Sequence, residues 1–182
     1  MKIYSMKYST SIFFSCIIIT LCNCKKTGNP PLQLPPATHI GADILACKIN
    51  GKIFISKGAG GKFGQMGPGV VYEVFNDSTV YIDATTLNPH YEIAINSIYK
   101  FNLGSYQFGD NHFNSGGEYY DDTNGTIPTG INQYNTDMAH SGSVTITYYD
   151  GNILAGTFAF DAVNGNDSVV HITEGRFDIQ NH

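Results

Sequence analysis

The sequence has no tryptophan and little charge. Asp, Glu, Lys and Arg make up 14% of its 182 residues, well below the roughly 25% of an average soluble domain. The hydrophobic fraction is 42%, which argues against disorder along the whole chain. The length leaves room for one domain and excludes two large ones. Twenty glycines, 12 tyrosines and 11 phenylalanines indicate turns and aromatic strands rather than helices.

Basic residues are the scarcest charged type in the sequence. From Cys24 onward there are eight Lys and Arg against fifteen Asp and Glu, and six of the eight precede residue 63. Binding to nucleic acid requires a clustered basic face that neutralises phosphates. We therefore expect no nucleic-acid partner.

No apolar run is long enough to cross a membrane. The main one, residues 12–21, has ten residues, whereas a spanning helix needs about 20. It follows Lys2 and Lys7 and precedes cysteines, an order typical of export signals. The run Leu21-Cys22-Asn23-Cys24 resembles the lipobox of bacterial lipoproteins, which implies that residues 1–23 are a signal peptide and that Cys24 carries the lipid. The alternative is an ordinary secretory signal cut nearby.

The next residues are rich in proline and poor in apolar side chains. Residues 24–40 contain four of the seven prolines, a composition that favours an extended, semi-rigid tether. We expect the folded domain to span residues 41–182. Once Cys24 carries lipid, Cys47 is the single free thiol of the mature chain, so no intramolecular disulfide forms.

Alternation of apolar and polar residues dominates the rest of the chain. In residues 143–149 the apolar positions 144, 146 and 148 alternate with Ser and Thr, the mark of a half-buried strand. The predicted strands are 44–49, 52–56, 70–75, 79–84, 91–98, 103–108, 143–149, 154–162 and 170–179. About eight or nine such strands predict an all-β fold, an antiparallel sandwich or an open barrel, and the lack of a regular repeat slightly favours the sandwich.

Two Gly-containing dipeptides predict tight hairpins. Asn50-Gly51 and Asp150-Gly151 each separate two predicted strands, and both dipeptides suit turns that require positive φ. A two-residue loop at Asn50-Gly51 places Cys47 opposite Phe54. Cys47 is then a packed apolar group rather than a reactive thiol.

The last predicted strand has an irregular parity. Val170 and Ile172 share one face, but Phe177 and Ile179 fall on the other. One extra residue at Glu174-Gly175 would bring all four to the same face, so we predict a β-bulge there.

No catalytic or cofactor motif is found. The glycine-rich stretch 57–69 resembles a phosphate loop, but Gly61-Lys62 is followed by Phe63 instead of Ser or Thr. Ser97-x-x-Lys100 lacks the companion motifs of penicillin-recognising enzymes. The six histidines show no zinc-binding spacing. We expect no cofactor, no metal and no enzymatic activity.

The segment from Gly109 to Gly142 is predicted to be long and irregular, and such loops are commonly functional or disordered. The candidate ligand-binding residues in it are Asp110, His112, Glu118, Tyr119, Tyr120, Asp121 and Asp122. Their carboxylates could bind calcium or simply form a solvated acidic loop. Adjacent Tyr119 and Tyr120 could stack on a sugar or pack in the interior.

Two blocks carry a family resemblance. They consist of Leu34-Pro35-Pro36-Ala37-Thr38, Gly41-Ala42 and 46–52 near the start, and of 156–160 and 170–178 near the end. Together they resemble a family of uncharacterised lipoproteins from Bacteroidota-type bacteria. The resemblance implies an outer-membrane lipoprotein and supplies no catalytic residue, only the lipid-bearing Cys24. Lys25-Lys26 replaces the acidic run that favours surface display in many such proteins, which indicates the periplasmic face.

The function expected from the sequence is a lipid-anchored module of the cell envelope, held at the membrane by its N-terminal lipid. Its partner would be an envelope protein or a small ligand bound by loops at one end of the sheet. Two alternatives stay open. One is an envelope hydrolase that acts on glycan or peptide with acids such as Glu118 and Asp121, and the other is a purely structural envelope component.

Overall fold

The computed structural model describes residues 32–60, 68–76, 79–99, 102–109, 115–123 and 131–182. The chain divides into two units, Met1–Pro31 and Leu32–His182, and only the second contains described residues. These residues form eleven strands and no helix. Accordingly, the described part of the chain contains no helix of the length and hydropathy needed to cross a membrane.

All the strands belong to one antiparallel sheet. Their bounds are β1 Ile44–Ile49, β2 Lys52–Lys57, β3 Gly69–Phe75, β4 Thr79–Leu87, β5 His90–Tyr99, β6 Gly104–Gln107, β7 Gly116–Asp121, β8 Gln133–Asn135, β9 Gly142–Tyr149, β10 Ile153–Val163 and β11 Val169–Gln180. The order along the sheet is β2-β1-β11-β10-β8-β7-β5-β4-β3, with β9 paired to β10 and β6 paired to β9.

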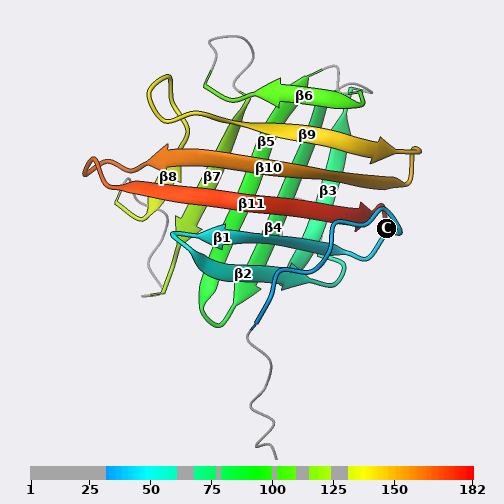
Figure 1. Cartoon of the computed structure of the whole chain (residues 1–182), viewed down its shortest axis with the longest axis horizontal. Coiled ribbons are helices and arrows are strands. Elements are labelled where there is room, and N and C mark those ends of the chain that lie inside the picture. The colour runs from blue at the N-terminus through cyan, green and yellow to red at the C-terminus, as the bar shows by residue number, and fades with distance from the viewer. Residues whose placement is uncertain (1–31, 61–67, 77–78, 100–101, 110–114, 124–130) are drawn as a thin grey trace, which may run out of the picture. The chain divides into compact units, whose positions relative to one another are not determined.

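The sheet folds back on itself until its two ends nearly meet. In Figure 1, β9, β10, β11 and β1 run across the front, and β3, β4, β5 and β7 cross steeply behind them. The chain after β2 reaches β3 through two backbone hydrogen bonds, from Val70 N to Gly58 O (2.9 Å) and from Gly60 N to Val70 O (2.8 Å). This nearly closed barrel confirms the predicted antiparallel all-β fold, and of the two predicted forms it is the barrel.

The barrel interior contains the inward-facing half of each strand. Its largest fully buried side chains include Leu45, Ile82, Ile93, Ile95, Ile98, Ile146, Leu154, Ile172, Phe177 and Ile179. Burial of each such side chain stabilises the fold by roughly 1.5–3 kcal/mol. Phe158 packs beside both Phe160 and Phe177, with ring centroids 6.2 and 6.3 Å apart.

The predicted hairpin at Asn50-Gly51 is confirmed. Ile49 pairs with Lys52, and the two turn residues have φ of 48° and 80°, as a primed two-residue turn requires. Cys47 pairs with Phe54 as predicted. Its thiol is fully buried, and burial raises its pKa to about 12.

The predicted bulge in β11 is also confirmed. Ala46 pairs with Arg176 and Lys48 with Thr173, so Glu174 and Gly175 share the space opposite one residue of β1. The residue with positive φ is Glu174 (53°). Gly175 is required for a different reason: a Cβ there would lie 2.6 Å from the Phe158 ring.

The prediction of an irregular segment from 109 to 142 is wrong for two parts of it. Residues 116–121 form β7 and residues 133–135 form β8. The sequence pattern does not predict β7 because this strand has Gly117 at an inward position where an apolar residue is expected. A Cβ on Gly117 would lie 2.6 Å from the Phe160 ring, so Phe160 fills that part of the interior and no apolar alternation marks the strand.

Candidate functional site

The alternation of β7 divides the candidate residues between two faces of the sheet. Tyr119 belongs to the core of the barrel and Asp121 lines the pocket at its mouth, whereas Glu118 and Tyr120 line cavities on the outer face. Asp122 follows the strand. Cys24, Asp110 and His112 lie outside the described residues. The described candidates on β7 therefore lie on two faces of the sheet rather than on one.

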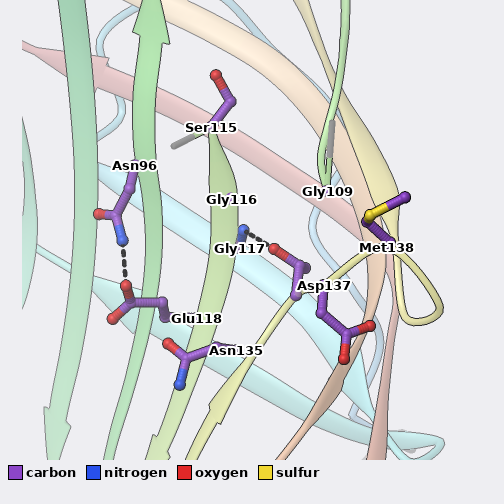
Figure 2. A pocket seen from close by; sticks show the side chains of 10 residues that line it. Asn96, Gly109, Ser115, Gly116, Gly117, Glu118, Asn135, Asp137 and Met138 are labelled. Carbon is purple, nitrogen blue, oxygen red and sulfur yellow. Dashed lines mark hydrogen bonds between the residues drawn. The ribbon is translucent and has the colours of Figure 1, made fainter. Parts of the chain in front are cut away.

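The larger cavity, here called the outer cavity, has a volume of about 340 Å³. Figure 2 shows the strand of Asn96, β7 and the chain around Asn135 to Met138 enclosing it. Its lining residues are Asn96, Gly109, Ser115, Gly116, Gly117, Glu118, Asn135, Thr136, Asp137 and Met138. Six of these ten residues carry an amide, hydroxyl or carboxyl side chain, and none of the ten is Lys or Arg.

Two hydrogen bonds shape the outer cavity. Asn96 Nδ2 donates to Glu118 Oε1 across β5 and β7, and the Gly117 amide donates to Thr136 Oγ1 at 3.2 Å (Figure 2). Asn135 pairs with Glu118 through the β8 ladder. The Asn135 side chain makes no hydrogen bond within the described part of the chain, so the Asn135 amide can bind a ligand.

The Asp137 carboxylate lies at the rim and is engaged by its own turn. Its Oδ1 atom accepts hydrogen bonds from the amides of Ala139 (2.8 Å) and His140 (2.6 Å). These hydrogen bonds, led by the one from His140, lower the pKa of Asp137. This carboxylate therefore holds the rim in shape and stays ionised.

Three carboxyl groups gather beside the outer cavity. Asp83 and Glu118 flank Ala94 on the neighbouring strands β4 and β7, and Glu92 lies two residues from Ala94 on β5. Burial, reinforced by the charge of Glu92, raises the pKa of Asp83 to about 7. Burial also raises the pKa of Glu92 and of Glu118. A smaller space of about 60 Å³ lies over Ala94 between Glu92 and Glu118.

A histidine and an aspartate meet at the end of this face. His90 Nδ1 lies 3.0 Å from Asp122 Oδ2, and the His90 ring meets Tyr120 edge-on at 6.1 Å. Asp122 Oδ1 is buried and has no hydrogen-bond partner among the described residues. No Ser, Thr or Cys is hydrogen-bonded to His90 in that part of the chain, so the pair lacks the nucleophile of a catalytic triad.

The pocket at the mouth of the barrel, here called the mouth pocket, has a volume of about 200 Å³. Its lining residues are Ile49, Asn50, Lys52, Ile53, Phe54, Tyr91, Tyr119, Asp121, Tyr134 and Val170. It contains four aromatic residues, whereas the outer cavity has none among its described lining residues. Open ends of barrels are common ligand sites.

Comparison with protein families identifies the greater part of the barrel. Residues 69–178 match DUF6252, a domain of unknown function. The chain belongs to the DUF6252 family. Comparison with curated proteins and with solved structures finds no match.

The DUF6252 region covers the two sites to different extents. All the residues that line the outer cavity lie within it. The mouth pocket takes half of its lining, residues 49–54, from the β1–β2 hairpin, which precedes the matched region.

Sequence reasoning missed most of the residues that shape these sites. Asp83 and Glu92 occupy polar positions of correctly predicted strands, and Asn96 lies four residues after Glu92 on the second strand. That pattern could have identified an outward polar face. It could not have shown that Glu118 joins them, because β7 was not predicted. Within the described residues, no three His, Cys, Asp or Glu side chains form a group that could hold a metal.

Proposed function

We propose that this protein is a lipid-anchored lipoprotein of the cell envelope, of the kind found in Bacteroidota-type bacteria, whose barrel binds a small ligand or partner without catalysing a reaction. The observation that carries this proposal is the outer cavity. It is concave, and among its mostly polar side chains the Asn135 amide makes no hydrogen bond in the described structure.

The anchor part of the proposal rests on the sequence around Cys24. Residues 1–23 have the charge and apolar order of an export signal, and Lys25-Lys26 follows the cysteine, which favours the periplasmic face of the outer membrane. Arg176 donates a hydrogen bond to Pro35 O, so the barrel holds the chain from Pro35 onward.

The composition of the outer cavity favours an uncharged ligand with several hydroxyl groups. Side-chain amides can donate hydrogen bonds to hydroxyls and accept them, and carboxylates accept them from hydroxyls. Phosphate or carboxylate ligands would face Glu118 and Asp137 with no Lys or Arg in the lining to neutralise them. We therefore propose a neutral oligosaccharide as the class of ligand.

The positions of Glu118 and Asp121 argue against the hydrolase alternative. Glu118 and Asp121 lie three residues apart on β7 and line different pockets on opposite faces. Two catalytic carboxylates must flank one bond about 5–10 Å apart, which this arrangement prevents. A purely structural role stays as the second candidate and predicts an outer cavity that binds nothing.

The anchor is tested by labelling cells with palmitate. We expect label in the unaltered protein and none in Cys24→Ser, which should also leave the membrane fraction. A Cys47→Ala variant is the matched control because Cys47 is the other cysteine outside residues 1–23, and it should keep both label and membrane association. Equal labelling of Cys24→Ser would reject the anchor.

The outer cavity is tested by titrating the full-length protein, in polyoxyethylene-ether micelles, with the trimer of N-acetylglucosamine. We expect the side-chain amide NMR signals of Asn96 and Asn135 to shift on binding. Asn135→Leu should remove the binding, and Asn181→Leu, at an exposed position near the C-terminus, should not. If the trimer shifts neither signal, binding of neutral oligosaccharides is wrong.

A further inference from the structure

The mouth pocket is built from aromatic rings on four strands. Phe54 comes from β2, Tyr91 from β5, Tyr119 from β7 and Tyr134 from β8. The ring centroids of Tyr91 and Tyr119 lie 6.0 Å apart, and those of Tyr119 and Tyr134 lie 5.6 Å apart. Both pairs are tilted, at 49° and 39°, so the rings line a curved wall rather than form one flat stack.

One carboxylate faces this aromatic wall. Asp121 Oδ1 accepts a hydrogen bond from the Thr123 amide at 3.1 Å, and no Lys or Arg of the described chain forms an ion pair with Asp121. Burial and the nearby charge of Asp121 raise the pKa of Tyr119. The pocket therefore has a negative electrostatic character on its β7 side, because no described Lys or Arg forms an ion pair with Asp121.

Two tyrosines of the wall also keep unused polar groups. The hydroxyls of Tyr91 and Tyr134 make no hydrogen bond within the described residues, although both rings pack against the core. The faces of aromatic rings carry negative charge density and attract cations positioned within about 6 Å. Aromatic rings beside a carboxylate are therefore suited to binding an ammonium group.

We propose that the mouth pocket binds a small organic cation with an alkylammonium head. The volume is sufficient, because a cavity of about 150 Å³ accommodates benzene and the mouth pocket measures about 200 Å³. Tyr91, Tyr119 and Tyr134 surround the head and Asp121 balances its charge. This site is separate from the outer cavity, and the inference does not depend on the membrane anchor.

Lys52 is the one residue of the lining that opposes a cation. It is exposed at the start of β2, and its long flexible side chain can keep the ammonium group in water. Its charge should nevertheless weaken the binding of a second cation. Removing the charge of Lys52 should therefore increase the affinity for a cation, whereas removing the charge of Asp121 should decrease it.

The experiment compares choline with 3,3-dimethylbutan-1-ol, its uncharged isostere, on the full-length protein in non-ionic micelles. Calorimetry gives the affinity. Because the chain has no tryptophan, its intrinsic fluorescence comes from 12 tyrosines, three of which line the mouth pocket, so a fluorescence change supports the calorimetric result. We expect choline to bind at least tenfold more tightly than the alcohol. Asp121→Asn should remove this preference, Tyr134→Leu should reduce choline affinity, and Lys52→Gln should increase it severalfold.

Glu174→Gln is the matched control, because Glu174 is a carboxylate on the exposed bulge of β11 where it pairs with Lys48. It should bind choline like the unaltered protein, and thermal unfolding checks that each variant folds. The inference is overturned if the alcohol binds within twofold of choline, if choline does not bind, or if folded Asp121→Asn keeps the preference. If Asp121→Asn does not fold, the comparison of choline with the alcohol on the unaltered protein decides the question.

Discussion

Thr38 Oγ1 donates a 2.6 Å hydrogen bond to Asp178 Oδ2, which ties the chain before the barrel to the last strand. The amides of Ile40 (3.0 Å) and Gly41 (2.8 Å) donate to the same carboxylate. Asp178 is 1% exposed, and hydrogen bonds to a buried charged group are among the stronger ones. Residues 38–41 are thus fastened to β11, and the two sequence blocks that carry the family resemblance meet in one contact.

Replacing Asp178 tests this contact. Asp178→Ala leaves the Thr38 hydroxyl and two backbone amides without their acceptor, so we expect the free energy of unfolding to fall by about 2–3 kcal/mol. Urea denaturation measures the change, and hydrogen exchange of the Ile40 and Gly41 amides should accelerate. Asp167→Asn, in an exposed turn, serves as the control. Unchanged exchange at Ile40 and Gly41 would contradict this view of the contact.

Gly175 and Glu174 should respond in opposite ways to substitution. Gly175→Ala places a methyl group 2.6 Å from the Phe158 ring and from Phe158 O, and overpacking of this kind costs about 1–3 kcal/mol. Glu174→Gly relieves a positive φ of 53° and gives up only an exposed ion pair with Lys48, so stability should stay within about 1 kcal/mol. Thermal unfolding of both variants distinguishes them. Equal destabilisation would show that the bulge does not have this geometry.

Asp83 should make stability depend on pH. Its pKa is raised from 3.8 to about 7 by burial and by the charge of Glu92, so the folded state keeps the proton over a range in which the unfolded chain has released it. This contribution to stability is fully present below about pH 4 and is lost as the pH rises to about 7.

Asp83→Asn removes that dependence. We expect the variant to be more stable than the unaltered protein at pH 8, on the order of 2 kcal/mol, and close to it at pH 4. Urea midpoints at the two pH values measure the difference, with Asp167→Asn as a matched exposed control. A variant less stable than the unaltered protein at pH 8 would argue against a strained carboxylate at this position.

Cys47 should be inert in the folded protein. Its thiol is fully buried and its pKa is raised to about 12, so almost no thiolate exists at neutral pH, and only the thiolate reacts. In a Cys24→Ser chain expressed without residues 1–23, where Cys47 is the only thiol, we expect iodoacetamide to label Cys47 at the rate of global unfolding. Labelling in 8 M urea gives the reference rate. Fast labelling under native conditions would mean that β1 and β2 open locally.

Local pattern was enough to predict most of the strands. The predicted strands 44–49 and 52–56 flank Asn50-Gly51, and a two-residue turn allows one register, so the pairing of Cys47 with Phe54 follows directly. The parity change between Ile172 and Phe177 likewise revealed the bulge, because a buried face must keep its period of two.

The sites depend on contacts between residues that are distant in the sequence. Nothing in residues 116–121 shows that Phe160 replaces the side chain missing at Gly117, and without β7 neither pocket can be assembled. Once β7 pairs with β5, Glu118 joins Asp83 and Glu92 on the outer face while Tyr119 and Asp121 join Tyr91 and Tyr134 at the mouth. Periodicity is a property of one segment, so short sequence patterns predict individual strands. The order of the strands depends on burial across the whole barrel, so only the folded chain reveals it.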